Sequence, residues 1–122
     1  MTNSRTKGRA GEQDVARRLR DELGIEVTRN WQAQAVQGGS DINGIPGWSI
    51  EVKRQKVFSN EWWPQAVRQA VKEGRRPALV YRLDRKPWRV RCCVSAVAPS
   101  CGHQFEIEMD LLDWVGLVRD SL

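Results

Sequence analysis

The chain has 122 residues, 40% of them hydrophobic, which is the size and composition of one globular domain with a single core. Its 20 Lys and Arg outnumber its 15 Asp and Glu, and the resulting net charge of +5 indicates an anionic partner. No apolar run approaches the roughly 18 residues that span a membrane, and the N-terminus is polar and basic rather than signal-like, so we expect a cytoplasmic protein.

Residues 8–22 are predicted to form the first helix, after a loose tail over residues 1–6. Four apolar residues recur at helical spacing and define one face: Val15, Ala16, Leu19 and Leu23. Gly24 follows, and glycine suits the left-handed position that ends many helices. We therefore expect one face of this helix to pack against a sheet.

Glu12 lies on the same helical face, three and four residues before Val15 and Ala16. A buried carboxylate needs a cation, a hydrogen-bond donor or a metal ion to remain ionised. Two interpretations are open. Glu12 contributes to a site on the sheet, or it only occupies the first helical turn, where the helix dipole favours an acid.

A strand, a loop and a hairpin are predicted next. The strand covers residues 25–31, and the polar residues 32–39 form a loop able to reach a substrate. Turn formers separate residues 41–45 from residues 48–53, so we expect these two runs to pair as a hairpin.

Asp41, Glu51 and Lys53 form the most informative pattern in the sequence. The hairpin places Asp41 beside Glu51, and Glu51 and Lys53 share one face of their strand. Two carboxylates offer Mg²⁺ hard oxygen ligands, and one of the waters that the ion keeps can attack phosphorus. Lys53 would donate to that water or to the phosphate oxygens as charge develops. The alternative is a surface ion pair, because a Glu-x-Lys triplet is common.

Residues 60–73 predict a second helix with a broad apolar face. Two adjacent lines of residues make up this face: Trp62, Ala66 and Ala70, and then Trp63, Val67 and Val71. Gln69 lies at its margin. Such a glutamine either hydrogen-bonds to backbone or supports chemistry at the reacting phosphate, and the sequence leaves both open.

Residues 77–83 and 88–94 predict two further strands, and a last strand and helix follow. The residues that indicate them are Phe105, Ile107 and Met109 for the strand, Asp110 for the N-cap, and Leu111, Trp114, Val115 and Val118 for the helix. The order αβββαββ, with this C-terminal strand and helix, predicts an α/β fold in which helices flank a mixed sheet.

The basic residues and tryptophans supply weaker candidates for nucleic-acid contacts. Arg54 and Lys56 continue from the strand of Glu51 and are candidates for phosphate contacts, with a solvated charged surface as the alternative. Trp88, beside Arg85 and Lys86, is the candidate for stacking on a base. Core packing is the commoner role of tryptophan.

A zinc site is not expected from the sulfur and imidazole groups near the C-terminus. Cys92 and Cys93 are adjacent on a predicted strand and point to opposite faces, and neither Cys101 nor His103 completes the usual short ligand spacing. With three cysteines and no secretion signal, we expect reduced thiols.

The ordered set of Glu12, Asp41, Glu51-x-Lys53 and Gln69 resembles the PD-(D/E)XK nuclease superfamily. Within it, the sequence is most similar to the archaeal Holliday-junction resolvases and related small phage endonucleases. The opening run from Lys7 to Glu12 and the later Arg85-Lys86-Pro87-Trp88 carry this likeness further. Residues 7–90 are covered. Ser40 stands where the superfamily name has proline.

The resemblance implies a restriction-endonuclease-like fold and a Mg²⁺-dependent endodeoxyribonuclease, with Mn²⁺ able to substitute. It implies metal ligation by Glu12, Asp41 and Glu51, a catalytic amine at Lys53 and a supporting role for Gln69. It also favours branched DNA as substrate, a homodimer that makes two symmetric cuts, and a phage or mobile-element origin. Residues 7–122 would then be a single nuclease domain, of which residues 98–122 are a C-terminal extension.

Two alternatives remain. The chain could be a non-catalytic DNA-binding or assembly module that retains the nuclease fold, or a ribonuclease. Intact carboxylates at Glu12, Asp41 and Glu51 argue against the first, because a pure binding surface gains nothing from acids that face phosphate. No signature of an RNA-binding module supports the second.

Overall fold

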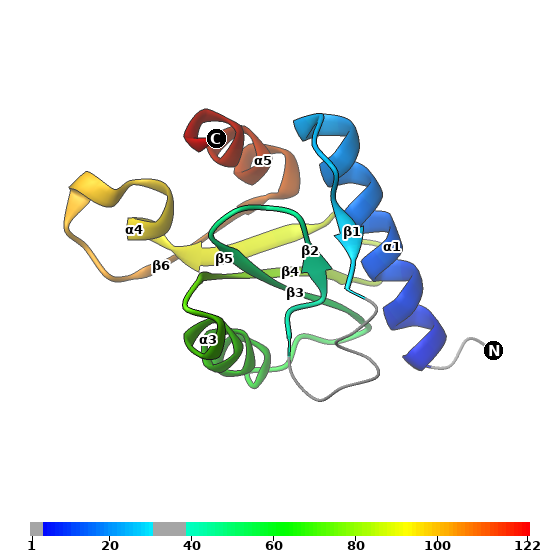
Figure 1. Ribbon diagram of the computed structural model, residues 1–122. Helices are drawn as coiled ribbons and strands as arrows, with labels where there is room; N and C mark the ends of the chain where they lie inside the picture. Colours follow the sequence, from blue (N-terminus) through cyan, green and yellow to red (C-terminus); the bar gives the residue numbers. More distant parts are fainter. Residues whose placement is uncertain (1–3, 31–38) are drawn as a thin grey trace.

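The computed structural model describes residues 4–30 and 39–122. Its elements follow the chain as α1 (Ser4–Leu23), β1 (Thr28–Arg29), β2 (Ile42–Asn43), β3 (Trp48–Gln55), α3 (Trp62–Glu73), β4 (Arg76–Leu83), β5 (Arg89–Cys93), α4 (Val94–Val97), η1 (Pro99–Cys101), β6 (Glu106–Asp110) and α5 (Leu111–Ser121). In these residues six strands form one sheet in chain order (Figure 1). The β3–β4 pair is parallel and the other pairs are antiparallel. The predicted mixed α/β sheet is confirmed.

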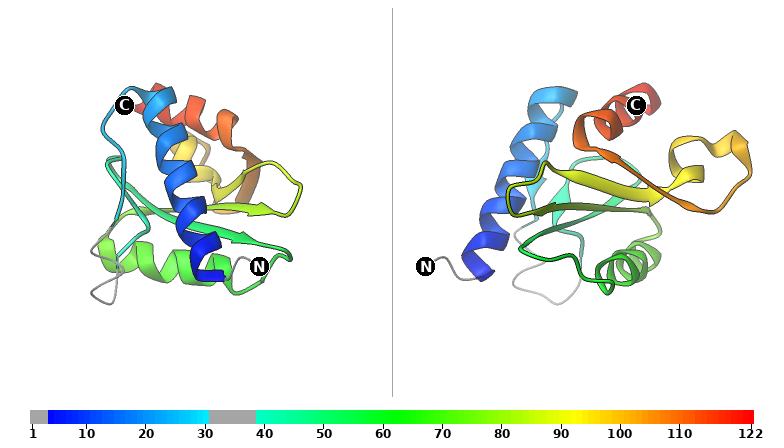
Figure 2. Two further views of the ribbon diagram at one scale, coloured as in Figure 1. Left: turned by 90° about the vertical axis from the view of Figure 1, so that its right-hand side faces the viewer. Right: turned by 180° about the vertical axis from the view of Figure 1, so that it is seen from behind.

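Helices cover both faces of the sheet. α1 and α5 lie on one face and α3 lies on the other, as the views in Figures 1 and 2 agree. In β3 the buried apolar residues Trp48, Ile50 and Val52 join the core beneath α1 and α5. The alternate residues therefore project toward α3, and this set includes Glu51 and Lys53.

The larger core is built around two tryptophans. Trp48 of β3 and Trp114 of α5 meet edge to face, with ring centroids 5.1 Å apart. A smaller cluster lies under α3, where Trp62 and Ala66 pack on Leu79. The prediction that a second apolar line of α3 belongs to the packed face is wrong for its last residue, because Val71 is 74% exposed. α3 covers mainly β3 and β4, so only the line through Trp62 is buried.

The hairpin that carries the candidate site forms as predicted, although β2 has only two residues. Ile42 pairs with Ile50, and the Asp41 N–H donates to the Ile50 carbonyl at 2.8 Å. Gly44 in the connection has a φ of 115°, a conformation that side chains rarely adopt. A Cβ at this position would lie 2.2 Å from the Glu26 carbonyl oxygen. Glycine is therefore required for the chain to pass this close to the segment before β1.

Gly44→Ala should lower the free energy of unfolding by at least about 2 kcal/mol, because it adds a backbone clash to an unfavourable φ. Gly74→Ala is the matched control, since Gly74 also has a positive φ, of 66°, but has open space around its Cβ position. The control should cost about 1 kcal/mol. Urea unfolding of both variants measures the difference, and equal losses would contradict the role given to the close approach.

Several predicted boundaries differ from the structure. α1 begins at Ser4, so residues 4–6 form its first turn rather than a loose tail. It ends as predicted at Gly24, whose φ is 67° and whose N–H donates to the Arg20 carbonyl at 2.9 Å. The first strand covers only β1, and Trp31 with the loop over residues 32–38 lies outside the described residues.

Near the C-terminus the structure contains two short helices that were not predicted, and it confirms the predicted strand and helix that follow them. α4 and η1 were not predicted, and they project on the side away from α1 (Figure 1). β6 and α5 were predicted, and α5 adds its buried face to the main core. Asp110 precedes α5 as expected, but its carboxylate accepts from Arg89 at 2.8 Å rather than capping the helix. None of the helices in residues 4–30 and 39–122 is long and apolar enough to cross a membrane.

Candidate active site

Asp41 and Glu51 lie side by side, as the hairpin predicts. The Asp41 Oδ2 accepts the Val52 N–H at 2.8 Å, which fixes this carboxyl against β3. The two carboxyl groups are close enough for the charge of Asp41 to act on Glu51. Lys53 follows on the same face of β3 and acts electrostatically on both acids.

Burial, above all, raises the pKa of both acids. The pKa of Asp41 rises to about 6, although the Val52 N–H opposes the change. The pKa of Glu51 rises to about 9, first through burial and then through the charge of Asp41. Lys53 lowers both pKa values but does not cancel these effects. The pair therefore keeps a proton near neutral pH.

The donor set of this pair fits a divalent metal ion. Mg²⁺ typically takes one or two protein carboxylates and keeps several waters. Two adjacent carboxyls whose negative charges disfavour each other would be stabilised in their ionised forms by a bound cation. In the described part of the chain no group of three acidic, histidine or cysteine side chains is close enough together to hold a metal ion.

The metal-free protein should lose stability as pH rises from about 4.5 to about 9. Across this window the native state holds protons that Asp41 and Glu51 release on unfolding, because burial raises their pKa values to about 6 and about 9. A native state that binds more protons than the unfolded state does is destabilised by rising pH, so the free energy of unfolding should fall across this window.

Urea unfolding in EDTA at several pH values measures this loss, and millimolar Mg²⁺ should reverse it at pH 8. The double variant Asp41→Asn/Glu51→Gln is the control, and it should show neither the pH dependence in this window nor the effect of Mg²⁺. A wild-type stability that stays flat over this range would contradict the raised pKa values.

Glu12 is buried, as its place on the apolar stripe predicts, but it is held by a cation of the protein itself. The Arg29 Nε donates to the Glu12 Oε2 at 2.6 Å, and both side chains are at most 10% exposed. The charge of Glu12 also helps to raise the pKa of Asp41, so the two acids are neighbours. The proposal that Glu12 decorates the first helical turn is wrong, because α1 begins eight residues earlier at Ser4. The part of Glu12 in a three-carboxylate metal site stays a prediction, since its carboxylate is ion-paired with Arg29 and also lies near Asp41.

Residues 3–109 match the family model described as "Phage putative PDDEXK endonuclease". The chain belongs to this endonuclease family. The resemblance seen in Glu12, Asp41 and Glu51-x-Lys53 is thereby confirmed, and the family match ends before α5.

The fold of this endonuclease is similar to that of a Holliday junction resolvase, Hjc, from the archaeal hyperthermophile Archaeoglobus fulgidus. The TM-score is 0.57 and the identity 21%, over 88% of this chain and 97% of the resolvase chain. The likeness establishes the restriction-endonuclease-like fold. The sequence matches none of the curated proteins with which it was compared.

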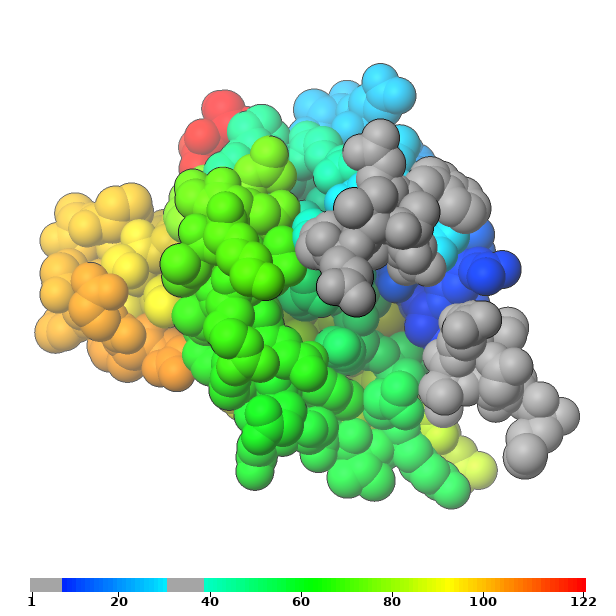
Figure 3. Space-filling model, turned by 60° about the horizontal axis from the view of Figure 1, so that its bottom comes forward, coloured from blue at the N-terminus to red at the C-terminus, as the bar shows by residue number. Residues whose placement is uncertain are grey.

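The candidate site, with Glu51 and Lys53, lies on the face of the sheet that α3 covers. Figure 3 shows the surface hollowed between α3 and the blue atoms of α1, with atoms in the colours of β3 at its floor. Gln69 is half-buried on α3. One turn further on, Glu73 accepts hydrogen bonds from two buried serines, Ser49 at 2.6 Å and Ser40 at 3.3 Å. Sequence reasoning missed Glu73, although it follows Gln69 at i+4 and so shares its helical face.

The structure separates the predicted DNA-contact residues. Arg85 and Lys86 are exposed in the turn between β4 and β5, and Lys56 is exposed just after β3. Arg54 is half-buried against α1, where a Cβ on Gly11 would lie 3.3 Å from the Arg54 Cβ. The glycine of the opening motif therefore allows α1 to approach β3 closely.

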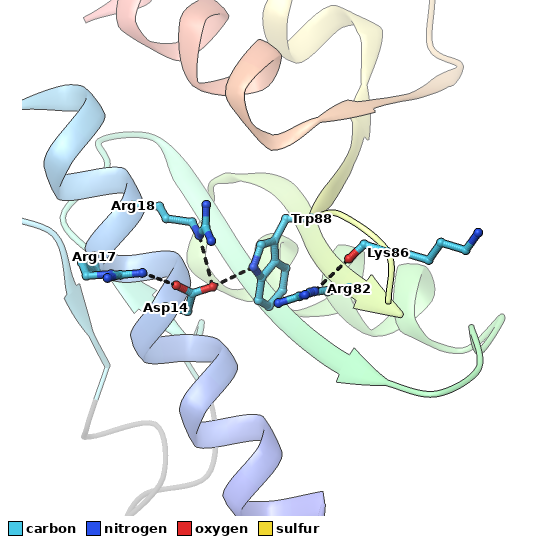
Figure 4. Close-up of polar contacts among 6 residues, drawn as sticks. All are labelled: Asp14, Arg17, Arg18, Arg82, Lys86 and Trp88. Atoms are coloured by element: carbon cyan, nitrogen blue, oxygen red, sulfur yellow. Dashed lines mark hydrogen bonds and ion pairs between the residues drawn. The ribbon is translucent and has the colours of Figure 1, made fainter. Parts of the chain in front are cut away.

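Trp88 does not fit the stacking role that we expected, because it is only 5% exposed and its ring packs in the core. Its Nε1 donates to the Asp14 Oδ2 at 2.8 Å (Figure 4). The same carboxylate accepts from Arg17 at 2.7 Å and from Arg18 at 3.1 Å, and these contacts lower the pKa of Asp14. Arg17 and Arg18 are thus already paired within the protein.

The cysteines are free thiols, as expected from their number. Cys92 is buried in the core, and burial raises its pKa to about 11. Cys93 is half-buried and Cys101 is exposed.

Proposed function

We propose that this protein is a Mg²⁺-dependent endodeoxyribonuclease that cleaves branched DNA, with Mn²⁺ able to substitute for Mg²⁺. The observation that carries the proposal is the pair of half-buried carboxyls at Asp41 and Glu51, with Lys53 on the same strand face as Glu51. An endonuclease of this family needs a cation site next to an amine, and these three residues supply both.

Each of the three residues has a distinct task. Asp41 and Glu51 would hold the metal ion, and both would ionise when it binds, so the proton that the pair keeps leaves to solvent. The bound ion supplies an activated water and positive charge beside the phosphate. Lys53 keeps its ammonium group beside the pair, where it donates to the attacking water or to a phosphate oxygen as charge develops. The Val52 N–H holds Asp41 in place at 2.8 Å throughout.

Gln69 would support this site from above. β3 and α3 run in opposite directions, since α3 connects the parallel strands β3 and β4. Glu73 contacts Ser49. From Glu73 back to Gln69 the helix advances about 6 Å, and from Ser49 forward to Glu51 the strand advances about 6.6 Å. Gln69 thus comes level with Glu51, where its amide can orient a water or the substrate.

Branched DNA is proposed as the substrate on the likeness to the Holliday junction resolvase. The net charge of +5 and the exposed Lys56, Arg85 and Lys86 are consistent with phosphate contacts that carry no sequence information. Resolution of a junction needs two symmetric cuts, so we propose a homodimer. Light scattering at micromolar concentration, with and without DNA, tests the dimer, and a monomer under both conditions would count against it.

Cleavage of four labelled substrates in Mg²⁺ and in EDTA tests the proposed function: a four-way junction, a linear duplex, a single strand and a structured RNA. Symmetric nicking of the junction in Mg²⁺, absent in Lys53→Ala, is the expected result. Cleavage of linear DNA alone would move the substrate to duplex, and turnover of RNA alone would favour a ribonuclease. Junction binding in EDTA without cleavage of any substrate in Mg²⁺ would favour a non-catalytic binding module.

A further inference from the structure

Glu73 is the last residue of α3 and touches the two chain segments that present the candidate metal ligands. Its Oε1 accepts the Ser49 hydroxyl at 2.6 Å, and its Oε2 accepts the Ser40 hydroxyl at 3.3 Å. Ser40 immediately precedes Asp41, and Ser49 lies two residues before Glu51 on the same face of β3. One carboxylate therefore connects the backbone next to both acids.

Both serines are buried, with 0% exposure, so their hydroxyls need partners within the protein. Ser40 has a second, longer contact to the Ile42 carbonyl at 3.4 Å, and the Asn30 side chain donates to the Ser40 carbonyl at 2.8 Å. The segment that leads into Asp41 is thus held by Asn30, just after β1, and by Glu73 of α3. A carboxylate accepts two hydroxyl donors more strongly than a neutral group does.

The end of α3 is itself fixed in space. Gly74 ends the helix with a φ of 66°, and the Arg75 N–H donates to the Ala70 carbonyl at 3.0 Å. Arg76 then begins β4, where its N–H donates to the Gly47 carbonyl at 2.9 Å and its guanidinium lies 4.5 Å from the centre of the Trp48 ring. Glu73 therefore projects from an anchored backbone onto the start of β3.

We propose that Glu73 is a positioning residue, which through Ser40 and Ser49 holds Asp41 and Glu51 at the separation that a divalent cation requires. This inference rests on the proposed function, since it assumes that the pair holds a metal ion. Groups that orient metal ligands typically change metal affinity by about 10- to 100-fold when they are removed.

Calorimetric titration with Mn²⁺ in the absence of DNA tests the inference directly. Glu73→Ala should weaken Mn²⁺ binding at least about 10-fold. Glu73→Gln should stay within about 3-fold of wild type, because its amide oxygen can accept from Ser49 while its NH₂ group donates to Ser40. Ser49→Ala removes one contact without touching the acid, so it should fall between them and remains informative if Glu73→Ala does not fold. Glu61→Ala removes an exposed acid just before α3 and is the matched control.

Cleavage by the same variants provides a second measurement. At saturating Mg²⁺, Glu73→Ala should lower kcat and leave KM for DNA unchanged, and Glu73→Gln should restore most of kcat. Wild-type Mn²⁺ affinity and kcat in folded Glu73→Ala and Ser49→Ala would overturn the inference. A loss in Glu73→Gln as large as in Glu73→Ala would also overturn it, since charge rather than the two contacts would then matter. Wild-type protein that binds no Mn²⁺ would instead refute the proposed function, and this inference with it.

Discussion

Glu51→Gln is expected to lower the cleavage rate by about 10³-fold or more while DNA binding persists, because the variant loses a metal ligand and keeps the shape of the site. Lys53→Ala should lose about 10²- to 10³-fold in rate with its metal affinity largely intact. The two losses therefore differ in kind. Single-turnover cleavage of a labelled junction, combined with calorimetric titration of Mn²⁺, separates them.

Two exposed residues on or beside α3 provide matched controls for these substitutions. Glu61→Gln repeats the change of acid to amide outside the site, and Lys72→Ala removes a lysine from the outer face of α3. Both should cleave at the wild-type rate. A Glu51→Gln variant as active as Glu61→Gln would remove Glu51 from the mechanism, and weakened metal binding in Lys53→Ala would place Lys53 among the metal-site residues.

Arg29→Met is expected to lower the free energy of unfolding by about 3 to 5 kcal/mol, because it removes the guanidinium from the buried Glu12 carboxylate. The pair is buried on both sides, with side-chain exposures of 5% for Arg29 and 10% for Glu12. The penalty of leaving a charge in the core is far larger than the net value of a surface ion pair. Urea unfolding at neutral pH in EDTA gives the magnitude.

An exposed ion pair on α1, the helix that carries Glu12, provides a comparison for the stability lost in Arg29→Met. Arg17→Met breaks the pair with Asp14, in which Arg17 is 60% exposed, and should cost less than about 1 kcal/mol. The double variant Glu12→Gln/Arg29→Met removes both charges and should recover much of the loss of Arg29→Met. If Arg29→Met costs no more than Arg17→Met, the buried pair does not stabilise the fold.

Local patterns were sufficient to predict most elements and the proximity of Asp41 and Glu51 in the candidate site. The turn formers between Ile42 and Trp48 fix the hairpin, and the hairpin alone places Asp41 beside Glu51. The C-terminal helix could be predicted for the same reason, since Leu111 and Trp114 recur at helical spacing over a short segment.

Contacts between distant segments could not be predicted in this way. Nothing in the sequence pairs Glu12 with Arg29, because the pairing depends on how α1 crosses β1. Glu73 reaches Ser49 only once α3 has folded back over β3. The burial of Trp88 did have a signal, since it precedes Val90 by two residues and so continues the buried face of β5.

The order of the strands has a consequence for how the molecule is made. Every strand from β1 to β6 pairs with the next one along the chain, so a nascent polypeptide can add each strand to the free edge of the sheet already formed. The hairpin that brings Asp41 and Glu51 together would be complete well before synthesis reaches α5. The apolar side beneath Trp114 would still face the solvent at that stage. We therefore expect a ribosome-bound chain that ends before Leu111 to expose apolar surface and to bind chaperones. The addition of α5 should bury this surface and abolish that binding.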